Sequence, residues 1–237
     1  MYKFLFLDLD DTILDFQKAE HIALSKTLRS FGLEPTETVL KRYNLINKAH
    51  WEALERKELT REQVLVGRFQ VLFDEIGIQV EPVTVARTYE YNLGIGHYFL
   101  PGAEEAVDRL SKKYKLYLAS NGTASVQKGR MTSANLYRFF EKVFVSQEIG
   151  ANKPSPEYFE RCFAQIPDFD KSKAIIVGDS LTSDILGGQN AGIATCWVNP
   201  HHKQGREDIR VDFEIESLSQ LEQLLENADT KKNSPLV

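Results

Sequence analysis

Cysteine is scarce in this chain, which has two among its 237 residues, Cys162 and Cys196. They lie far apart and form no Cys-x-x-Cys pair, so a disulfide framework and a cysteine zinc site are both disfavoured. Each cysteine has apolar neighbours, and we expect both to be buried core residues.

Long hydrophobic runs are also missing, since no apolar stretch approaches the roughly 20 residues that span a bilayer. The chain opens with strand-like sequence, without a basic segment followed by a long apolar one, so no signal peptide is visible. We therefore expect a cytoplasmic protein without a membrane partner.

Positive charge is in short supply as well, because 34 acidic residues outnumber 29 basic ones. A net charge of −5 provides no electrostatic footprint for a nucleic-acid backbone, so we expect no nucleic-acid polymer as a partner. A small anionic substrate would need a local cation to offset the repulsion.

The most informative stretch is Phe4-Leu5-Phe6-Leu7-Asp8-Leu9-Asp10-Asp11-Thr12, where four apolar residues run into three carboxylates and a threonine. The apolar run is typical of a strand buried on both faces, and open α/β sheets bind ligands at the carboxyl ends of such strands. Asp8 and Asp10 point to the same side of an extended chain. They repel each other unless a cation lies between them or one is protonated. The stretch predicts a metal site, an acid/base pair or both; a turn or a helix N-cap is the simpler alternative.

The rest of the chain shows two patterns. Residues 16–94 have apolar residues at helical spacing and predict successive helices, one of them opened by a capping box of Thr60 and Gln63 and ended near Gly77. From residue 100 onward strands and helices alternate, which predicts a parallel sheet with right-handed crossovers. The expected strands cover residues 116–120, 142–146, 174–178, 193–198 and 213–215, and the expected helices cover 103–112, 125–134, 156–165, 184–191 and 218–225.

We therefore expect an α/β fold, with a Rossmann-like parallel-sheet core and an all-helical cap inserted after strand 1. The core would take residues 1–15 and 97–228, the cap residues 16–96, and a flexible polar tail residues 229–237. Gly94 and Gly96 lie in the second connection to the cap, where they either permit hinge motion or only form turns.

Two further segments supply groups that suit an anion. A predicted strand ends in Ser120-Asn121-Gly122, where a hydroxyl and backbone N–H groups could hold an oxyanion, although a plain Asn-Gly turn would look the same. Lys153 precedes Pro154 and Pro156 at the start of a predicted helix. That arrangement would fix one cation near an anion, and an ordinary surface lysine is the alternative.

Another predicted strand ends in Gly178-Asp179, and Asp184 follows five residues later. Carboxylates suit hard divalent cations such as Mg²⁺, which take one or two protein carboxylates together with water and phosphate. Asp184 opens a predicted helix, so N-capping is its competing explanation.

These four segments resemble, in order, the four motifs of the haloacid dehalogenase (HAD) superfamily. They are D-x-D-x-T at 8–12, the strand end at Ser120, Lys153, and G-D-x-x-x-x-D at 178–184. The helical block between the first two motifs is similar to the helical (C1) cap type, and the resemblance reaches to about residue 226. The opening Asp8–Phe16 segment most resembles the bacterial house-cleaning pyrimidine 5′-nucleotidases.

The resemblance implies how the acidic residues divide the work. Asp8 would be the nucleophile that forms an aspartyl-phosphate, and Asp10 would be the general acid and base. Mg²⁺ would be held by Asp8, by the main-chain oxygen of Asp10 and by Asp179. Thr12 would position Asp10 through a hydrogen bond.

The resemblance also implies a phosphate site. Ser120 and the backbone N–H groups of Asn121 and Gly122 would bind phosphoryl oxygens, and Lys153 would tie Asp8 to the phosphate. Asp184 would lie behind these groups and orient Lys153 or a metal-bound water.

The function expected from the resemblance is that of a Mg²⁺-dependent phosphomonoesterase. Its partner would be a small phosphate monoester, a pyrimidine nucleoside monophosphate by resemblance. The intact pair of Asp8 and Asp10 favours phosphoryl chemistry over dehalogenation. The oligomeric state stays open between monomer and homodimer.

Three alternatives to a nucleotidase remain: a sugar-phosphate or phosphoglycolate-type phosphatase, a phosphomutase, and a non-enzymatic protein that binds a phosphorylated ligand. No Arg-plus-Lys cluster early in the cap supports a mutase, and the intact motifs disfavour a non-enzymatic role. Aromatic residues of the cap either stack on a base or fill the cap's own core, namely Phe16, Tyr43, Trp51 and Tyr98.

Overall fold

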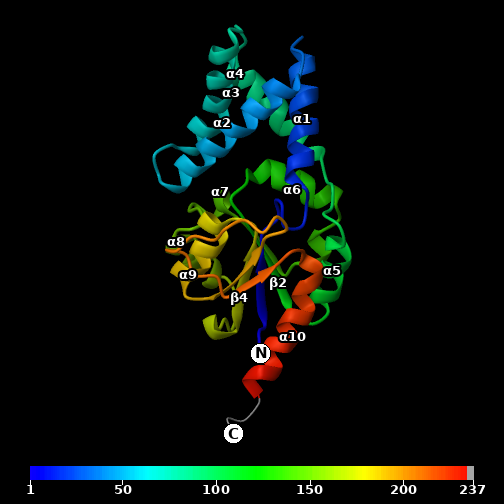
Figure 1. The fold of residues 1–237 in the computed structure, drawn as a ribbon, viewed down its shortest axis with the longest axis vertical. Coiled ribbons are helices and arrows are strands. Elements are labelled where there is room, and N and C mark those ends of the chain that lie inside the picture. Colours follow the sequence, from blue (N-terminus) through cyan, green and yellow to red (C-terminus); the bar gives the residue numbers. More distant parts are fainter. Residues whose placement is uncertain (234–237) are drawn as a thin grey trace. The chain divides into compact units, whose positions relative to one another are not determined.

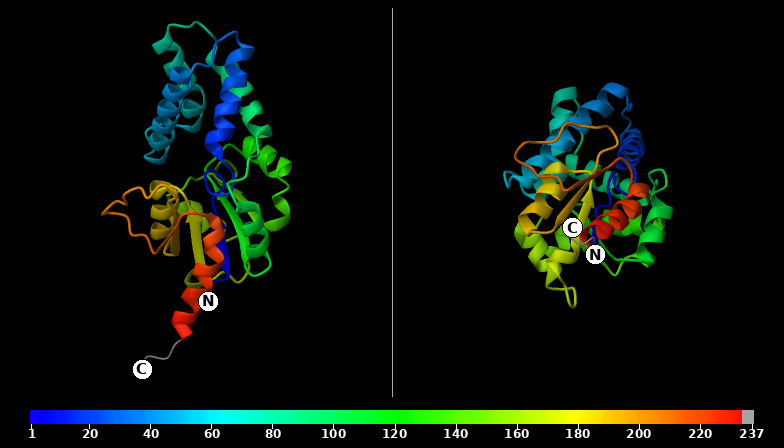
Figure 2. Two further views of the ribbon diagram at one scale, coloured as in Figure 1. Left: turned by 45° about the vertical axis from the view of Figure 1, so that its right-hand side comes forward. Right: turned by 60° about the horizontal axis from the view of Figure 1, so that its bottom comes forward.

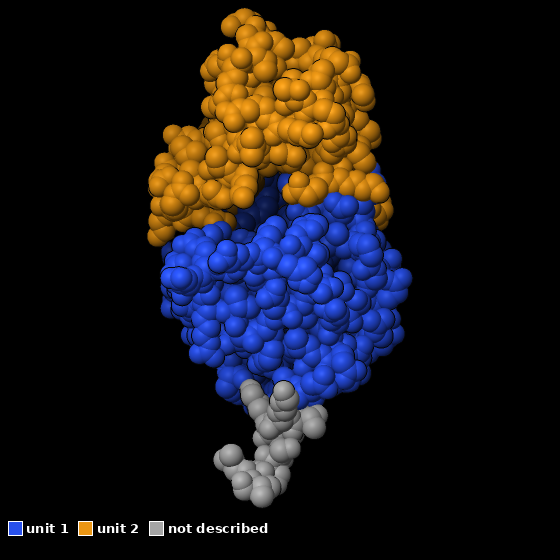
Figure 3. Space-filling view, in the orientation of Figure 1, with its two compact units in different colours: residues 1–16, 98–124, 134–237 blue, residues 17–97, 125–133 orange. Residues whose placement is uncertain are grey.

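The computed structural model describes residues 1–233, with side chains up to residue 228. The chain forms two compact units, which Figure 3 shows in different colours. The α/β unit comprises residues 1–16, 98–124 and the chain from residue 134 onward, and the helical unit comprises residues 17–97 and 125–133.

A six-stranded parallel sheet forms the centre of the α/β unit, in the order β3-β2-β1-β4-β5-β6. Its strands are β1 (Phe4–Leu7), β2 (Lys115–Ser120), β3 (Lys142–Val145), β4 (Ala174–Gly178), β5 (Ala194–Val198) and β6 (Phe213–Ile215). Helices cover both faces, with α5 (Ala103–Ser111) and α10 (Leu221–Asn233) on one side, and α8 (Pro156–Phe163) and α9 (Leu186–Ala191) on the other (Figure 1, Figure 2). The predicted α/β fold with a parallel sheet is confirmed.

Strand β1 is central because all four of its residues are apolar and fully buried. Phe6 stacks on Tyr117 of β2 with ring centroids 5.3 Å apart, and it meets the edge of Phe163 at 5.5 Å. Burial of one such side chain contributes about 1.5–3 kcal/mol. Leu7 pairs with Leu118 of β2 and Val177 of β4, so the residues that follow these three strands meet at one edge of the sheet.

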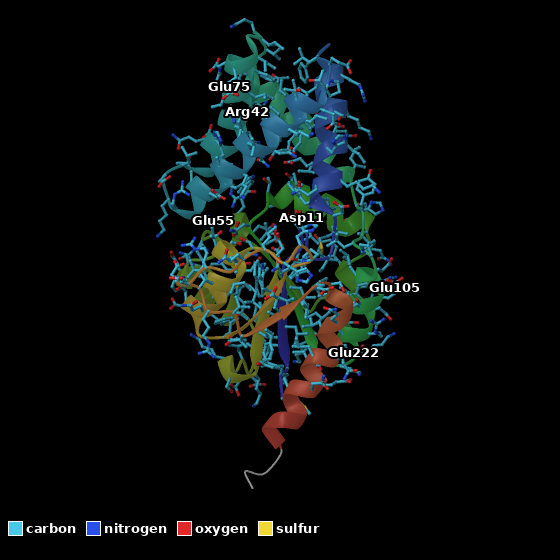
Figure 4. All side chains as sticks on the ribbon, viewed as in Figure 1. Asp11, Arg42, Glu55, Glu75, Glu105 and Glu222 are labelled. Carbon is cyan, nitrogen blue, oxygen red and sulfur yellow. The ribbon has the colours of Figure 1, made fainter. Side chains whose placement is uncertain are left out.

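Four helices make up most of the helical unit, α1 (Phe16–Ser30), α2 (Glu37–Glu55), α3 (Arg61–Ile76) and α4 (Pro82–Ile95). The predicted capping box is confirmed, because Thr60 Oγ1 accepts from the N–H of Gln63 and Gln63 Oε1 accepts from the N–H of Thr60. Helix α3 ends at Gly77, whose φ of 70° lies in the left-handed region that favours glycine. On the surface, Arg42 of α2 and Glu75 of α3 form a two-bond ion pair (Figure 4).

The core of the helical unit is aromatic. The rings of Tyr43, Phe69 and Tyr89 lie 5.1–5.7 Å apart by their centroids. Tyr43 is completely buried there, so it fills the core of the unit and is not a surface for base stacking. Trp51 is partly exposed, and the guanidinium of Arg61 lies 5.5 Å from the centroid of its ring. Phe16 and Tyr98 are also partly exposed, and both belong to the α/β unit.

Helix α6 (Ala124–Ser133) falls largely in the helical unit, whereas the expected boundaries assigned residues 97–228 to the core. Within that unit α6 contacts the end of α4 through Gly129. A Cβ atom at Gly129 would lie 2.4 Å from the carbonyl oxygen of Gly94, so only glycine allows this approach of the two backbones. Arg130 Nε donates to the carbonyl oxygen of Gly96 at 3.1 Å.

Several element ends differ from the expected ranges by one residue or more, and the ends of β3 and α10 are examples. Strand β3 stops at Val145 because Ser146 opens a short helix, α7 (Ser146–Ile149). Helix α10 continues to Asn233, past the expected start of the tail at residue 229. The rest of that tail, residues 234–237, lies outside the described residues.

Two expectations about composition can be compared with the structure. Both cysteines are free and buried, as predicted. Over residues 1–233, no helix combines the length and the apolar character needed to cross a membrane.

Candidate active site

The carboxyl ends of β1, β2 and β4 bring the sequence-predicted residues of three motifs to one edge of the sheet. Asp8 follows β1, Ser120 ends β2, and Asp179 follows β4. The N–H of Asp8 donates to the carbonyl oxygen of Val177 at 2.9 Å and extends the pairing of β1 with β4 by one residue. The backbone that carries Asp8 is therefore fixed by the sheet itself.

Lys153 reaches this edge from the loop before α8, and its side chain is only 1% exposed. Its ammonium group donates to Asp8 Oδ1 at 2.7 Å, to Asp184 Oδ1 at 2.5 Å and to the carbonyl oxygen of Ala119 at 2.6 Å. These bonds use all three donors of the ammonium group. Burial lowers the pKa of Lys153, but the adjacent carboxylates of Asp184 and Asp8 outweigh burial and raise it above its usual value. The interpretation as a surface lysine is wrong.

Asp184 lies inside a helical turn, Leu181–Ile185, and does not open it. The N-cap is Ser180, whose Oγ accepts from the N–H of Ser183 at 3.2 Å. Asp184 is 1% exposed and its Oδ2 accepts from the N–H of Ser180 at 3.2 Å, while its Oδ1 binds Lys153. The N-cap explanation of Asp184 is therefore wrong, and its contact with Lys153 agrees with a role in orienting that lysine.

Gly178 is required at the end of β4 because Asp184 occupies the space beside it. A Cβ atom at position 178 would lie 2.2 Å from Asp184 Oδ2, far inside van der Waals contact. The glycine thus lets the carboxylate of Asp184 lie directly against the strand end.

Three carboxylates gather around Lys153. Asp8, Asp179 and Asp184 each offer an oxygen, and the three oxygens lie within 4.8 Å of one another. Burial raises the pKa of Asp8 to about 7; Lys153 opposes this shift, and Asp184 and Asp10 add to it. Burial also raises the pKa of Asp179 well above its usual value, and the charges of Asp184, Asp8 and Asp11 reinforce the shift.

This cluster fits a hard divalent cation. One lysine cannot balance the two buried carboxylates of Asp8 and Asp184 together with the partly buried carboxylate of Asp179, and carboxylate oxygens are ligands that Mg²⁺ prefers. Both oxygens of Asp184 already accept hydrogen bonds from the protein, whereas Asp8 binds Lys153 through Oδ1 and has a second oxygen for a cation. The donor set therefore suits a cation held mainly by Asp8 and Asp179. Asp10 was expected to bind the metal only through its main-chain oxygen. Among the described residues, its side-chain carboxylate is not part of this cluster.

Trp197 supports Asp179, a contact that sequence reasoning missed. Its indole Nε1 donates to the carbonyl oxygen of Asp179 at 2.8 Å. Trp197 belongs to β5 and packs with Ile185 and Ile209. Eighteen residues separate Trp197 from Asp179, so only the pairing of β4 with β5 brings them together.

The end of β2 forms the phosphate-site candidate. Ser120 is 1% exposed, and its Oγ accepts from the N–H of Gly122 at 3.0 Å. The side chain of Asn121 turns toward the loop of Lys153. Its Oδ1 accepts from the N–H of Lys153, and its Nδ2 donates to the carbonyl oxygen of Lys153, both at 2.9 Å. The segment is thus more than a plain Asn-Gly turn, although the sequence pointed only to the backbone N–H of Asn121.

Asp10, Asp11 and Thr12 follow Asp8, and they differ in exposure and in hydrogen bonding. Asp11, labelled in Figure 4, has a left-handed φ of 54°, and its Oδ1 accepts from the N–H of Phe16, the first residue of α1. The capping interpretation of the acidic stretch therefore applies to Asp11 and not to buried Asp8. Asp10 is partly exposed. The hydroxyl of Thr12 is buried without a hydrogen-bond partner among the described residues, so the expected bond from Thr12 to Asp10 is absent.

Comparisons with known proteins agree with this arrangement. The profile of the family described as haloacid dehalogenase-like hydrolase matches residues 5–198. The HAD-hydrolase YfnB of Bacillus subtilis is 37% identical over 97% of both chains. A crystal structure of YfnB bound to magnesium, which reveals interdomain movement, superposes with a TM-score of 0.91 at 38% identity, over 94% of this chain and 98% of that one.

Two further relatives have a stated substrate class. The pyrimidine 5′-nucleotidase PynA of Streptococcus pneumoniae is 37% identical over 93% of both chains. The pyrimidine 5′-nucleotidase YjjG of Escherichia coli is 30% identical over 94% of this chain and 98% of its own.

Proposed function

The chain belongs to the haloacid dehalogenase-like hydrolases and is an enzyme of that family. From the site at the carboxyl ends of β1, β2 and β4, we propose that it is a Mg²⁺-dependent phosphomonoesterase that acts on pyrimidine nucleoside monophosphates. The observation that carries the phosphatase proposal is the buried Lys153 between Asp8 and Asp184, beside Asp179. In this arrangement Asp8 is the nucleophile, Lys153 is the fixed cation, and the carboxylates of Asp8 and Asp179 are ligands for a second cation.

In the proposed first step, a carboxylate oxygen of Asp8 attacks phosphorus in line with the ester oxygen. The new bond is an acyl phosphate, the P–O ester bond breaks, and Asp10 gives its proton to the leaving alkoxide. In the second step Asp10 takes a proton from water, which attacks phosphorus and breaks the bond to Asp8. Inorganic phosphate leaves and the Asp8 carboxylate is restored.

Lys153 and the end of β2 would hold the charge that develops on the phosphoryl oxygens. The ammonium group already touches Asp8 Oδ1, so it can stabilise the nucleophile and the phosphoryl group together. Ser120 would donate its hydroxyl hydrogen to a phosphoryl oxygen. Asp184 keeps the lysine charged and fixed.

Asp8, Asp179 and the main-chain oxygen of Asp10 would hold Mg²⁺. When bound, the ion neutralises charge on the phosphoryl group and lowers the pKa of the Asp8 carboxyl, so that Asp8 approaches the phosphate as an anion.

Substrate class rests on the two relatives named as pyrimidine 5′-nucleotidases. We propose that residues 16–96 serve as a cap that reads the group attached to the phosphate, and that a monomer or a homodimer is the active form. Tyr43 lies in the core of the helical unit, so base recognition would fall to more exposed side chains such as Trp51.

Phosphate release from a substrate panel tests this proposal. Purified protein with Mg²⁺ should hydrolyse dUMP, UMP and dTMP in preference to sugar phosphates and phosphoglycolate, and a chelator should abolish turnover. Asp8→Asn, which keeps the shape of the side chain, should lower kcat by about 10³-fold or more.

The matched control is Asp108→Asn, because Asp108 of α5 is a partly exposed aspartate, paired with Lys112 at the end of that helix and outside the site. It should stay within twofold of the parent. Preference for a sugar phosphate would reject the nucleotidase assignment, and full activity of Asp8→Asn would reject the nucleophile.

A further inference from the structure

We propose that the side chain of Asn121 is a positioning residue, which places the ammonium group of Lys153 by binding the main chain of that lysine. This inference rests on the proposed function. It assigns to the amide side chain a role separate from that of its own backbone N–H, and it links the end of β2 to the loop that carries the catalytic cation.

Asn121 satisfies both polar main-chain groups of Lys153. The N–H of Lys153 donates to Asn121 Oδ1 and its carbonyl oxygen accepts from Asn121 Nδ2, each at 2.9 Å. An asparagine side chain offers the acceptor and the donor in one plane, so the two bonds fix both the position and the orientation of the peptide groups. Lys153 lies in a loop between α7 and α8, where no strand or helix ladder would do this.

The far end of Lys153 is anchored to the same strand. Its ammonium group donates to the carbonyl oxygen of Ala119, two residues before Asn121. Strand β2 therefore holds the ammonium group of the lysine through Ala119, and Asn121, the residue that follows the strand, holds its main chain. The remaining two donors of the ammonium group bind Asp8 and Asp184. Their direction depends on the position of the main chain of Lys153.

Such an anchor should act on the rate of chemistry more than on substrate binding. A displacement of about 1 Å in a group that stabilises the transition state costs on the order of 10²-fold in rate. Removal of supporting partners one layer behind a site typically costs about 10–100-fold. We therefore expect Asn121→Ala to lower kcat by about 10–100-fold while KM changes less than threefold.

The test is a double-mutant cycle measured as phosphate release from the preferred substrate of the parent enzyme. The variants are Asn121→Ala, Lys153→Met and both together, each checked for its thermal midpoint. If Asn121 acts through Lys153, the double variant should match Lys153→Met within twofold, because the lysine that Asn121 would place is gone. Asn121→Asp keeps an acceptor for the N–H of Lys153 and loses the donor to its carbonyl, so it should lie between the parent and Asn121→Ala.

Asn190→Ala is the matched control. Asn190 Nδ2 donates to the carbonyl oxygen of Pro154, the next residue of the same loop, at 3.1 Å. Its loss removes an asparagine-to-loop bond without touching Lys153, and kcat should stay within twofold. This control and the split between kcat and KM decide the matter even if Lys153→Met does not fold.

Several results would overturn the proposal. They are parent-like kcat in Asn121→Ala, additive losses in the double variant, a rise in KM as large as the fall in kcat, or a lower thermal midpoint with unchanged kcat. An inactive parent enzyme would instead reject the phosphatase function itself.

Discussion

Lys153 of the α/β unit and Arg68 of the helical unit are both buried cationic side chains, and they are held in different ways; Arg130 is also buried in the helical unit. Lys153 of the α/β unit contacts the carboxylates of Asp8 and Asp184 directly. Arg68 of the helical unit donates from Nη1 to Asn47 Oδ1 at 2.8 Å, and Asn47 in turn donates to Glu20 at 2.7 Å. The guanidinium of Arg68 also lies 5.0 Å from the ring of Tyr89 and 5.4 Å from the ring of Phe69.

The difference in their surroundings indicates that Lys153 belongs to a functional site and Arg68 to a structural core. Around Lys153 the buried carboxylates outnumber the cation, and the pKa values of Asp8 and Asp179 are raised by burial and mutual repulsion. Such an excess of charge favours binding of a further cation. Around Arg68 the charge is met by a relay of hydrogen bonds and by aromatic faces. We expect the first arrangement to matter for activity and the second for stability.

Removal of the site cation should give the largest effect. Lys153→Met keeps the length of the side chain and removes its charge, so kcat should fall by about 10²–10³-fold because the developing phosphoryl charge loses a fixed partner. Steady-state phosphate release measures this. Lys142→Met, at an exposed position at the start of β3, should remain within twofold. A Lys153→Met enzyme with more than a tenth of the parent kcat would remove the contrast between the two cations.

Removal of the charge of Arg68 should have the opposite effect, with a loss of stability and little change in kcat. Arg68→Met removes the donor to the buried Oδ1 of Asn47, the residue that binds buried Glu20, so the free energy of unfolding should fall by about 3 kcal/mol. Urea unfolding measures the loss, and kcat at 25 °C should change less than threefold. Arg42→Met breaks an exposed pair with Glu75 and should cost less than about 1 kcal/mol. A tenfold loss of kcat at unchanged stability would place Arg68 among the substrate-binding residues.

The same contrast explains how much the sequence could tell. The fold was predictable because its signals are local, as in the apolar run Phe4–Leu7 and the capping box of Thr60 and Gln63. The cluster of Asp8, Asp179 and Lys153 was predictable because each residue belongs to a short motif. Parallel strand ends meet at one edge of the sheet.

What the sequence did not reveal depends on contacts between distant segments. The amide of Asn121 with Lys153, the indole of Trp197 with Asp179, and the backbone contact of Gly129 with Gly94 join residues 18 to 35 positions apart. No periodicity records such pairs. Thr12 shows the converse, because its motif suggested a hydrogen bond that its buried hydroxyl does not make.

Loss of the hydrogen bond from Trp197 to Asp179 should give the smallest effect, which is a change in the affinity of the site for Mg²⁺. Trp197→Phe keeps the aromatic packing with Ile185 and Ile209 and removes only the N–H that binds the carbonyl oxygen of Asp179. Because that bond fixes the backbone of a proposed Mg²⁺ ligand, we expect the apparent Kd for Mg²⁺ to rise about tenfold, while kcat at saturating Mg²⁺ changes less than threefold. Isothermal titration of the protein with Mg²⁺ measures the affinity without turnover. Trp51→Phe, at the partly exposed tryptophan of the helical unit, should leave that affinity unchanged. Equal Mg²⁺ affinity in Trp197→Phe and the parent would show that the hydrogen bond from Trp197 is not needed and that packing alone holds Asp179 in place.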